Sequence, residues 1–406
     1  MNQKPKEKYQ EPTGDHVVSA RAPREVLPSV YEVFMNEENI PIYKGIGMYD
    51  VRQLPLAPWK RIGGQGTFIE LDGQAGYYGM YAVEVPAGGV LNPERHMYEE
   101  QFLVIQGRGS TEIWREGNPK KQIFEWQHGT LFSVPVNIWH RLVNATSSPA
   151  LVLVVTSAPS VMELFPTRSF IFDNSYEFLD RYDESEDYFK PRDEFEPVQG
   201  GRAMLRSSLI PDVATCYVPR DNFFGPIGYR FFWSTMAGNT SFHNFIAQYP
   251  SGRYSFAHCH EAGRVLVCLR GKGYSLNWSL KLGKRPWEAG KGHLVNRQDY
   301  IPGGMVTAAP GSGGWFHQHF STGKDNMKLI AIRHPLRREE PGEEIELPDG
   351  TTFLGPGTHK VLFTEEDPQV RKDYQETLKK EGAEFTMPES IYREQASPGQ
   401  QDFGGV

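Results

Sequence analysis

The chain has 406 residues, of which 39% are hydrophobic and 23% are charged, so it is long enough for two domains with packed cores. Its net charge of −7, without a basic stripe, argues against nucleic acid as a partner. No apolar run approaches the roughly 20 residues of a membrane-spanning helix, and the first 20 residues lack the apolar block of a signal peptide. We therefore expect a cytoplasmic protein that does not contact a membrane.

The first half of the chain predicts a β-barrel. After a flexible arm over residues 1–25, short apolar or alternating runs are separated by turn residues. These runs cover residues 78–85, 101–105, 110–114, 122–126, 130–134 and 150–156. Their length and spacing are typical of an all-β barrel or sandwich, which we place at residues 26–160.

The second half repeats this organisation after a break. Residues 161–215 are acidic and aromatic without a clean period, and we interpret them as a connector with one or two short helices. Strand-like runs then resume at 242–249, 265–269, 273–278 and 328–333, which predicts a second barrel over residues 216–335. The extension 336–406 is polar.

One helix is predicted in this extension, from Pro368 to Glu381. Asp367 is its expected N-cap, and proline is favoured at the first helical position. We interpret this helix as a packing or dimer element rather than as a lid.

A pattern of glycine, histidine and carboxylate residues occurs twice. In the first half it consists of Gly88, Glu94-Arg95-His96, Glu100 and Gly107, followed by Gly129, Pro135, Asn137, His140 and Asn144. In the second half it consists of Gly252, His258-Cys259-His260, Arg264 and Gly271, followed by Gly304, Pro310, Gly314, His317 and Ser321.

These spacings resemble the two motifs of the cupin superfamily, G-x5-H-x-H-x3-E-x6-G and G-x5-P-x-G-x2-H-x3-N. The four half-motifs follow one another in order, with one two-residue insertion after Pro310, and they cover roughly residues 60–160 and 230–335. The chain is therefore identified as similar to a bicupin. This resemblance implies an all-β fold of two tandem jelly-roll barrels, each able to hold one metal ion.

The second barrel offers three histidines. His258 and His260 would project from the same face of a strand, because side chains two residues apart point the same way. With His317 from a distant strand they suit Fe(II), and Mn(II), Zn(II), Ni(II), Cu(II) and Co(II) are alternatives. Arg264 replaces the family's carboxylate ligand, so Glu261 would have to bend in if a carboxylate takes part.

Three neighbours of this set are candidates for catalysis. Arg264 would anchor a carboxylate or enolate of the substrate if it faces the cavity, or would be a salt-bridge partner if it faces outward. His319 shares its strand face with His317 and is a candidate acid/base, a spare ligand or a packed histidine. Glu261 is the nearest carboxylate.

The first barrel keeps His96, Glu100 and His140 but has Glu94 in place of the leading histidine. Two imidazoles and two carboxylates predict a site for Fe(II), Mn(II) or Zn(II). In the alternatives, Glu94 is a general base, or the barrel is degenerate and retained for structure or dimerisation.

The three-histidine set resembles that of cupin dioxygenases of the cysteine, β-diketone and gentisate types. The main hypothesis is therefore an oxidoreductase, a non-haem Fe(II) dioxygenase that combines O2 with a small oxygen-chelating organic acid or enol/phenol. The alternative is a metal-dependent isomerase, lyase or decarboxylase that uses the Glu-rich first barrel, or a non-catalytic small-molecule-binding cupin. In each case we expect a small anionic ligand and a homo-oligomer.

Overall fold

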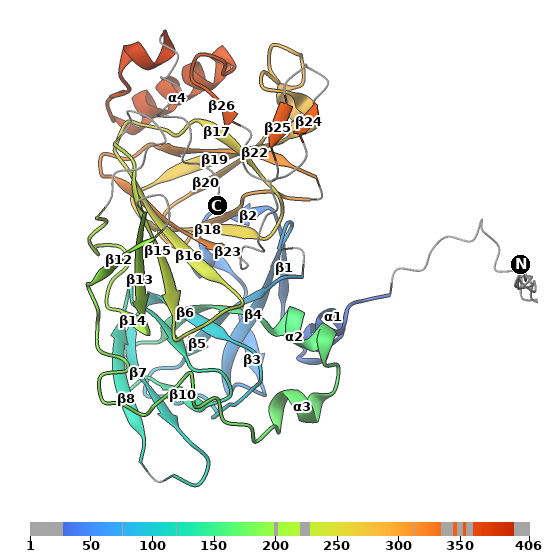
Figure 1. Cartoon of the computed structure of the whole chain (residues 1–406), viewed down its shortest axis with the longest axis vertical. Coiled ribbons are helices and arrows are strands. Elements are labelled where there is room, and N and C mark those ends of the chain that lie inside the picture. The colour runs from blue at the N-terminus through green and yellow to red at the C-terminus, as the bar shows by residue number, and fades with distance from the viewer. Residues whose placement is uncertain are drawn as a thin grey trace, which may run out of the picture.

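The computed structural model describes residues 27–74, 76–118, 120–198, 202–219, 228–311, 313–333, 344–346, 352–354 and 360–393. Most of the secondary structure in these ranges is β-strand. Two barrels follow one another along the long axis of the molecule, as Figure 1 shows. Within the described ranges, no helix combines the length and the apolar character that a membrane span requires.

The N-terminal barrel is formed by two sheets. The larger sheet has the order β1-β4-β5-β11-β6-β9-β14, with β3 beside β4. Its strands are β1 (Ile42–Gly45), β3 (Ala57–Trp59), β4 (Gly64–Leu71), β5 (Gly79–Val85), β6 (Glu100–Gln106), β9 (Leu131–Val134), β11 (Ala150–Thr156) and β14 (Leu209–Ile210). The smaller sheet has the order β10-β7-β8, with β7 (Arg108–Trp114), β8 (Gln122–Gln127) and β10 (Trp139–Val143).

The C-terminal barrel repeats this arrangement. Its larger sheet has the order β12-β13-β15-β16-β23-β18-β21-β2, and its smaller sheet has the order β20-β19-β22-β17-β26. The larger sheet contains β2 (Gly47–Met48), β12 (Phe195–Val198), β13 (Arg202–Ser207), β15 (Arg230–Met236), β16 (His243–Tyr249), β18 (Arg264–Arg270), β21 (Met305–Thr307) and β23 (Met327–Arg333). The smaller sheet contains β17 (Ala257–His260), β19 (Gly273–Ser279), β20 (Asn296–Tyr300), β22 (Trp315–Ser321) and β26 (Lys360–Val361). A separate hairpin pairs β24 (Glu344–Glu346) with β25 (Thr352–Leu354).

The two barrels exchange a short strand. The order β4-β5-β11-β6-β9 in the first barrel corresponds to β15-β16-β23-β18-β21 in the second. At the end of this order, β9 pairs with β14, which lies in the chain between β13 and β15 of the second barrel, whereas β21 pairs with β2, which lies between β1 and β3 of the first barrel. Each barrel thus completes its larger sheet with residues that lie outside its own run of strands.

Helices cover the outer surfaces of the barrels. In the N-terminal half they are α1 (Val30–Glu37), α2 (Ala158–Leu164) and α3 (Arg168–Phe172), and Figure 1 shows them on one side of the N-terminal barrel. The C-terminal helix is α4 (Pro368–Glu381), which begins at the N-cap Asp367 as the sequence predicts. Short 3-10 helices lie at η1 (Val51–Gln53), η3 (Leu280–Leu282), η4 (Gly292–Leu294) and η5 (Glu389–Tyr392).

Three hydrophobic cores follow from strand alternation. Phe102 and Val104 of β6 face the interior of the first barrel, whereas Leu103 and Ile105 face a core that the two barrels share. In the same way, Leu266 of β18 lies in the core of the second barrel and its neighbours lie in the shared core. The larger sheets are therefore apolar on both faces, and burying the outer faces against each other holds the barrels together.

Candidate metal centre

Three predicted ligands meet inside the N-terminal barrel. Glu100 is the first residue of β6, His96 lies just before that strand, and His140 lies on β10. The turn before β10 contributes to this arrangement, because Asn137 adopts a left-handed φ of 57° and its N–H donates to the carbonyl of His96 at 3.0 Å. Asparagine tolerates this conformation, which explains how it replaces the glycine of the motif.

The ligand atoms of this cluster are close together and buried. The Nε2 atom of His96 lies 3.2 Å from Oε2 of Glu100, and the Nε2 atom of His140 lies 3.9 Å from the same oxygen. All three ligand atoms lie within 4.8 Å of one another, and none of the three residues is more than 2% exposed.

Hydrogen bonds leave one atom of each side chain facing the centre. The Nδ1 atoms of His96 and His140 lie 2.9 and 3.1 Å from the carbonyl oxygens of Tyr98 and Ile138. The Tyr81 hydroxyl donates to Oε1 of Glu100 at 2.8 Å. The remaining atoms, both Nε2 atoms and Oε2, are buried without a hydrogen-bond partner among the described residues.

This asymmetry fits a metal ion. A carbonyl acceptor at Nδ1 fixes the tautomer that carries its proton there, which leaves the Nε2 lone pair free to ligate. Two imidazoles and one carboxylate on one side of an ion form the facial triad of Fe(II) enzymes, and the carboxylate also suits Mn(II). Orphaned buried polar atoms are costly, and a bound cation would satisfy all three.

The protonation of the cluster agrees with this interpretation. Burial lowers the pKa of His96 to about 4 and also lowers the pKa of His140, so both rings are neutral at neutral pH. Burial raises the pKa of Glu100 to about 7. The site therefore disfavours its own negative charge until a cation offsets the burial.

The fourth predicted ligand, Glu94, is placed differently. It pairs with His140 across the strands, but its Oε2 accepts a hydrogen bond from Nη1 of Arg61 at 2.6 Å. Arg61 also donates through Nε to Glu38 at 3.0 Å. Glu94 thus lies beside the cluster, in an ion pair and outside the group of converging ligand atoms.

The C-terminal barrel brings two of its predicted ligands together. His258 of β17 and His317 of β22 are opposite each other in register, and their Nε2 atoms lie 2.8 Å apart. This separation suits a hydrogen bond between the rings, or two adjacent ligands of one ion, whose nitrogens lie roughly 3 Å apart at bond lengths of about 2.1 Å. Burial lowers the pKa of both rings well below the usual value, so they are neutral.

The other predicted residues of this barrel have varied positions. The side chain of His260 lies outside the described part of the structure. His319 is buried beside His317, and its Nδ1 lies 2.6 Å from the hydroxyl of Ser275. Burial lowers the pKa of His319 to about 3.

Arg264 lies on the inward face of β18. It is 7% exposed and shares strand parity with Leu266 and Cys268, which belong to the core of this barrel. Its Nη1 donates to the backbone carbonyl of Glu261 at 3.3 Å, so the link between these two predicted residues goes through the main chain. Arg333 lies opposite Arg264 in register on β23 and stacks on Trp233.

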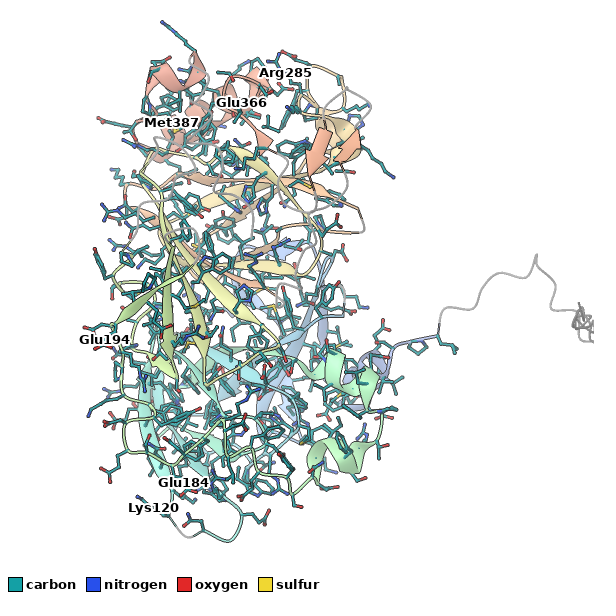
Figure 2. The ribbon with its side chains drawn as sticks, in the orientation of Figure 1. Lys120, Glu184, Glu194, Arg285, Glu366 and Met387 are labelled. Carbon is teal, nitrogen blue, oxygen red and sulfur yellow. The ribbon has the colours of Figure 1, made fainter. Side chains whose placement is uncertain are left out.

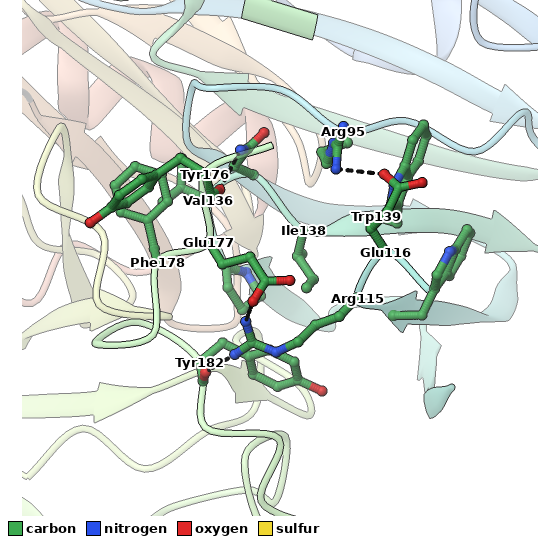
Figure 3. Close-up of a pocket in the computed structure, with 13 residues that line it drawn as sticks. Arg95, Arg115, Glu116, Val136, Ile138, Trp139, Tyr176, Glu177, Phe178 and Tyr182 are labelled. Carbon is green, nitrogen blue, oxygen red and sulfur yellow. Dashed lines mark hydrogen bonds and ion pairs between the residues drawn. The ribbon is translucent and has the colours of Figure 1, made fainter. Parts of the chain in front are cut away.

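A small pocket lies behind the first metal site. Its volume is about 20 Å³, which suits a single water molecule. Arg95 and Trp139 line it, and they point outward because they are the strand neighbours of His96 and His140. Figure 3 shows Arg95 paired with Glu116 and Arg115 paired with Glu177 across the pocket. None of the predicted ligands lines it.

Comparison with known proteins agrees with this geometry. Residues 81–156, which run from β5 to β11 and include His96, Glu100 and His140, match the family model of the cupin domain. The second barrel repeats the strand order of the first. Residues 81–156 are a cupin domain, and the fold of the chain is that of two tandem cupin-like barrels. The prediction of two tandem jelly-roll barrels with short helices in the connector and the C-terminal extension is confirmed.

Several solved structures are similar to this chain. An oxalate decarboxylase of Bacillus subtilis studied for its Mn(II) centres is 10% identical, with a TM-score of 0.42 over 71% of this chain and 77% of that one. The formate complex of Lactobacillus farciminis oxalate decarboxylase is 10% identical, with a TM-score of 0.43 over 71% and 86%. The vicilin of hazelnut, Corylus avellana, is 10% identical, with a TM-score of 0.42 over 71% and 85%. No curated protein matches the sequence.

The sequence did not reveal the residues that support the ligands of this cluster. Tyr81 and Arg61 reach the site from β5 and from the turn before β4, outside both motifs. Tyr98 stacks on the ring of His96 at 3.7 Å between ring centroids. The only sequence signal for Tyr81 is its inward position in an alternating strand.

Proposed function

We propose that this chain is a metal-dependent lyase, decarboxylase or isomerase that acts on a small organic acid in its N-terminal barrel. The observation that carries the proposal is the convergence of three buried ligand atoms without hydrogen-bond partners. The carboxylate of Glu94 lies next to them without joining them. A metal site with a carboxylate beside it that does not bind the ion suits proton transfer to or from a bound acid.

The donor set favours Fe(II) or Mn(II) at this site. His96, Glu100 and His140 would hold the ion, and the remaining positions would be open to the substrate. When bound, the ion would act as a Lewis acid that polarises a carboxylate or carbonyl oxygen of the substrate. Buried rings around the cluster, among them Tyr98 and Phe102, exclude water and strengthen electrostatic interactions.

Glu94 is the proposed acid/base group. It reaches the site on the same strand face as His96, and Arg61 fixes the position of its carboxylate. Glu94→Gln should abolish turnover while the metal remains bound, because the amide keeps the shape of the side chain but cannot exchange a proton.

Metal analysis and activity assays test the proposal. The parent protein should contain a transition metal in its N-terminal barrel, and the double variant His96→Ala/His140→Ala should lose it. His128→Ala is the matched control, since His128 lies in the same barrel and contacts the carbonyl of Ile105 instead of the ligand cluster. A panel of small organic acids, followed by CO2 release and by O2 uptake, separates the reaction classes. Full metal content in the double variant would refute the site.

The dioxygenase hypothesis is the second candidate, and the C-terminal barrel supports it. The 2.8 Å separation of the His258 and His317 Nε2 atoms and the adjacent ring of His319 supply a set of neutral imidazoles. Here Fe(II) would be held by these histidines together with His260, and Arg264 would contact an anionic substrate. O2 uptake that is lost in His258→Ala/His317→Ala and kept in His96→Ala/His140→Ala would favour this candidate. Tight metal binding without turnover of any acid would favour a binding protein.

A further inference from the structure

The position of Glu94 calls for an explanation, because it occupies the place of a ligand in the motif. Its N–H donates to the carbonyl of His140 at 2.9 Å, and its own carbonyl accepts from the N–H of His140 at 3.0 Å. Side chains of such a cross-strand pair lie on the same face, about 5 Å apart at Cβ. The carboxylate of Glu94 can therefore reach the centre that His140 faces.

Arg61 draws this carboxylate to one side. The ion pair between Nη1 and Oε2 is 2.6 Å long, and the side chains of Arg61 and Glu94 are 25% and 15% exposed. A partly exposed pair of this kind opens more readily than a fully buried one.

The guanidinium of Arg61 is itself held from several directions. Its Nε donates to Glu38, which also accepts from the indole N–H of Trp59. Its Cζ lies 5.2 to 5.8 Å from the ring centroids of Phe34, Trp59 and Phe172, which come from α1, β3 and α3. These contacts fix the position of the Arg61 guanidinium. The Glu94 side chain therefore bends toward Arg61, whereas Arg61 does not bend toward the metal site.

We propose that Arg61 is a positioning residue that holds the Glu94 carboxylate off the metal, so that the ion keeps three protein ligands and Glu94 stays available for proton transfer. The inference rests on the metal site of the proposed function. A guanidinium binds a carboxylate strongly, so Arg61 competes with the ion for Glu94. With Arg61 in place, the site presents three protein ligands and keeps positions open for substrate.

A mutant cycle read by metal affinity tests this proposal. Mn(II) is titrated into metal-free protein, and free Mn(II) is followed by electron paramagnetic resonance. Arg61→Met should release Glu94 to the ion and tighten Mn(II) binding by roughly tenfold or more. Glu94→Gln alone should leave the affinity within about twofold of the parent, because Glu94 is not a ligand there. In Arg61→Met/Glu94→Gln the gain should disappear.

Two further variants serve as controls. Arg141→Met removes another partly exposed arginine, which pairs with Glu112 at 2.9 Å and points outward as the strand neighbour of His140, so it should not alter the affinity. If Arg61→Met folds poorly, Arg61→Gln takes its place. It keeps a hydrogen-bond donor near Glu38 and should show the same gain in Mn(II) affinity.

The outcomes distinguish this inference from the proposed function. Unchanged or weaker Mn(II) binding in both Arg61 variants would overturn the inference, as would a gain that persists in the double variant. Loss of the proposed function would show instead as a parent that binds no Mn(II), or binds it equally well in His96→Ala/His140→Ala.

Discussion

At the scale of single residues, the hydrogen bonds on the far side of the ligands determine how strongly the N-terminal site binds a metal ion. The Tyr81 hydroxyl donates a hydrogen bond to Oε1 of Glu100, and Oε2 faces the two histidines. Partners of this kind orient metal ligands, and their loss typically weakens metal affinity by about 10–100-fold. Tyr81 therefore belongs to the metal site although it offers no ligand.

Tyr81→Phe should weaken Mn(II) or Fe(II) binding by roughly 10–100-fold, because Oε1 of Glu100 loses its donor and the carboxylate can rotate. The change is measured by metal titration at neutral pH. Tyr182→Phe is the control, since it removes a hydroxyl that bonds Gln122 at 2.7 Å and does not contact Glu100. Equal affinities in the parent and in Tyr81→Phe would show that Tyr81 does not orient the ligand.

At the scale of elements, the sequence allowed the ligands to be grouped but not all of their strands or their side-chain partners to be predicted. Apolar runs predicted β5 and β6, and motif spacing grouped His96, Glu100 and His140, but β10 was not predicted as a strand. The ion pair of Glu94 depends on Arg61, which is 33 residues away in the chain. Only the closed barrel brings these two residues together, so the spacing of the motif could not separate a ligand from an ion-pair partner.

The helix α4 also combines a feature that the sequence predicts with contacts that it does not. Its start was predicted from Asp367 and Pro368, and the structure adds that Val370, Tyr374 and Leu378 are its buried residues. The contact between the start of this helix and the C-terminal barrel was not predicted. It is made by Glu366, which is buried at the end of the molecule seen in Figure 2. Glu366 accepts hydrogen bonds from the Tyr254 hydroxyl and from Nε2 of Gln318.

Glu366 should make the stability of this region depend on pH. Burial raises the pKa of its carboxyl to about 8, so the folded chain holds the proton more tightly than the unfolded chain does. Its contribution is complete below the ordinary pKa of about 4.5 and is lost as the pH rises toward 8. From about pH 6 to about pH 9, the parent should therefore lose more in melting temperature than Glu366→Gln.

Glu381→Gln is the control for this prediction. Glu381 ends the same helix, but it is a partly exposed partner of Lys272. Its pH dependence should match that of the parent. If Glu366→Gln also matches the parent, the carboxyl of Glu366 does not control the pH response.

At the scale of the whole molecule, the exchanged strands make the two barrels one folding unit. Gly47 and Met48 pair with Val306 and Met305 of the second barrel, and Leu209 and Ile210 pair with the first. The exchange also places Met48 in the core that the barrels share. Motif spacing could not reveal it, because each exchanged strand is only two residues long and carries no pattern.

Gly47→Ala should therefore loosen the second barrel, although residue 47 lies in the chain between β1 and β3 of the first. A Cβ at this position would lie 2.4 Å from the carbonyl oxygen of Met305, so the two strands must separate. Overpacking of this kind costs about 1–3 kcal/mol of folding free energy. Hydrogen exchange should become faster at β21 and stay slow at β9, because β9 pairs with β14 instead.

Gly323→Ala is the control, since its nearest new contact, at 3.2 Å, is the flexible side chain of Lys272. Faster exchange spread evenly over both barrels would indicate general destabilisation and would contradict a local role for the exchanged strand.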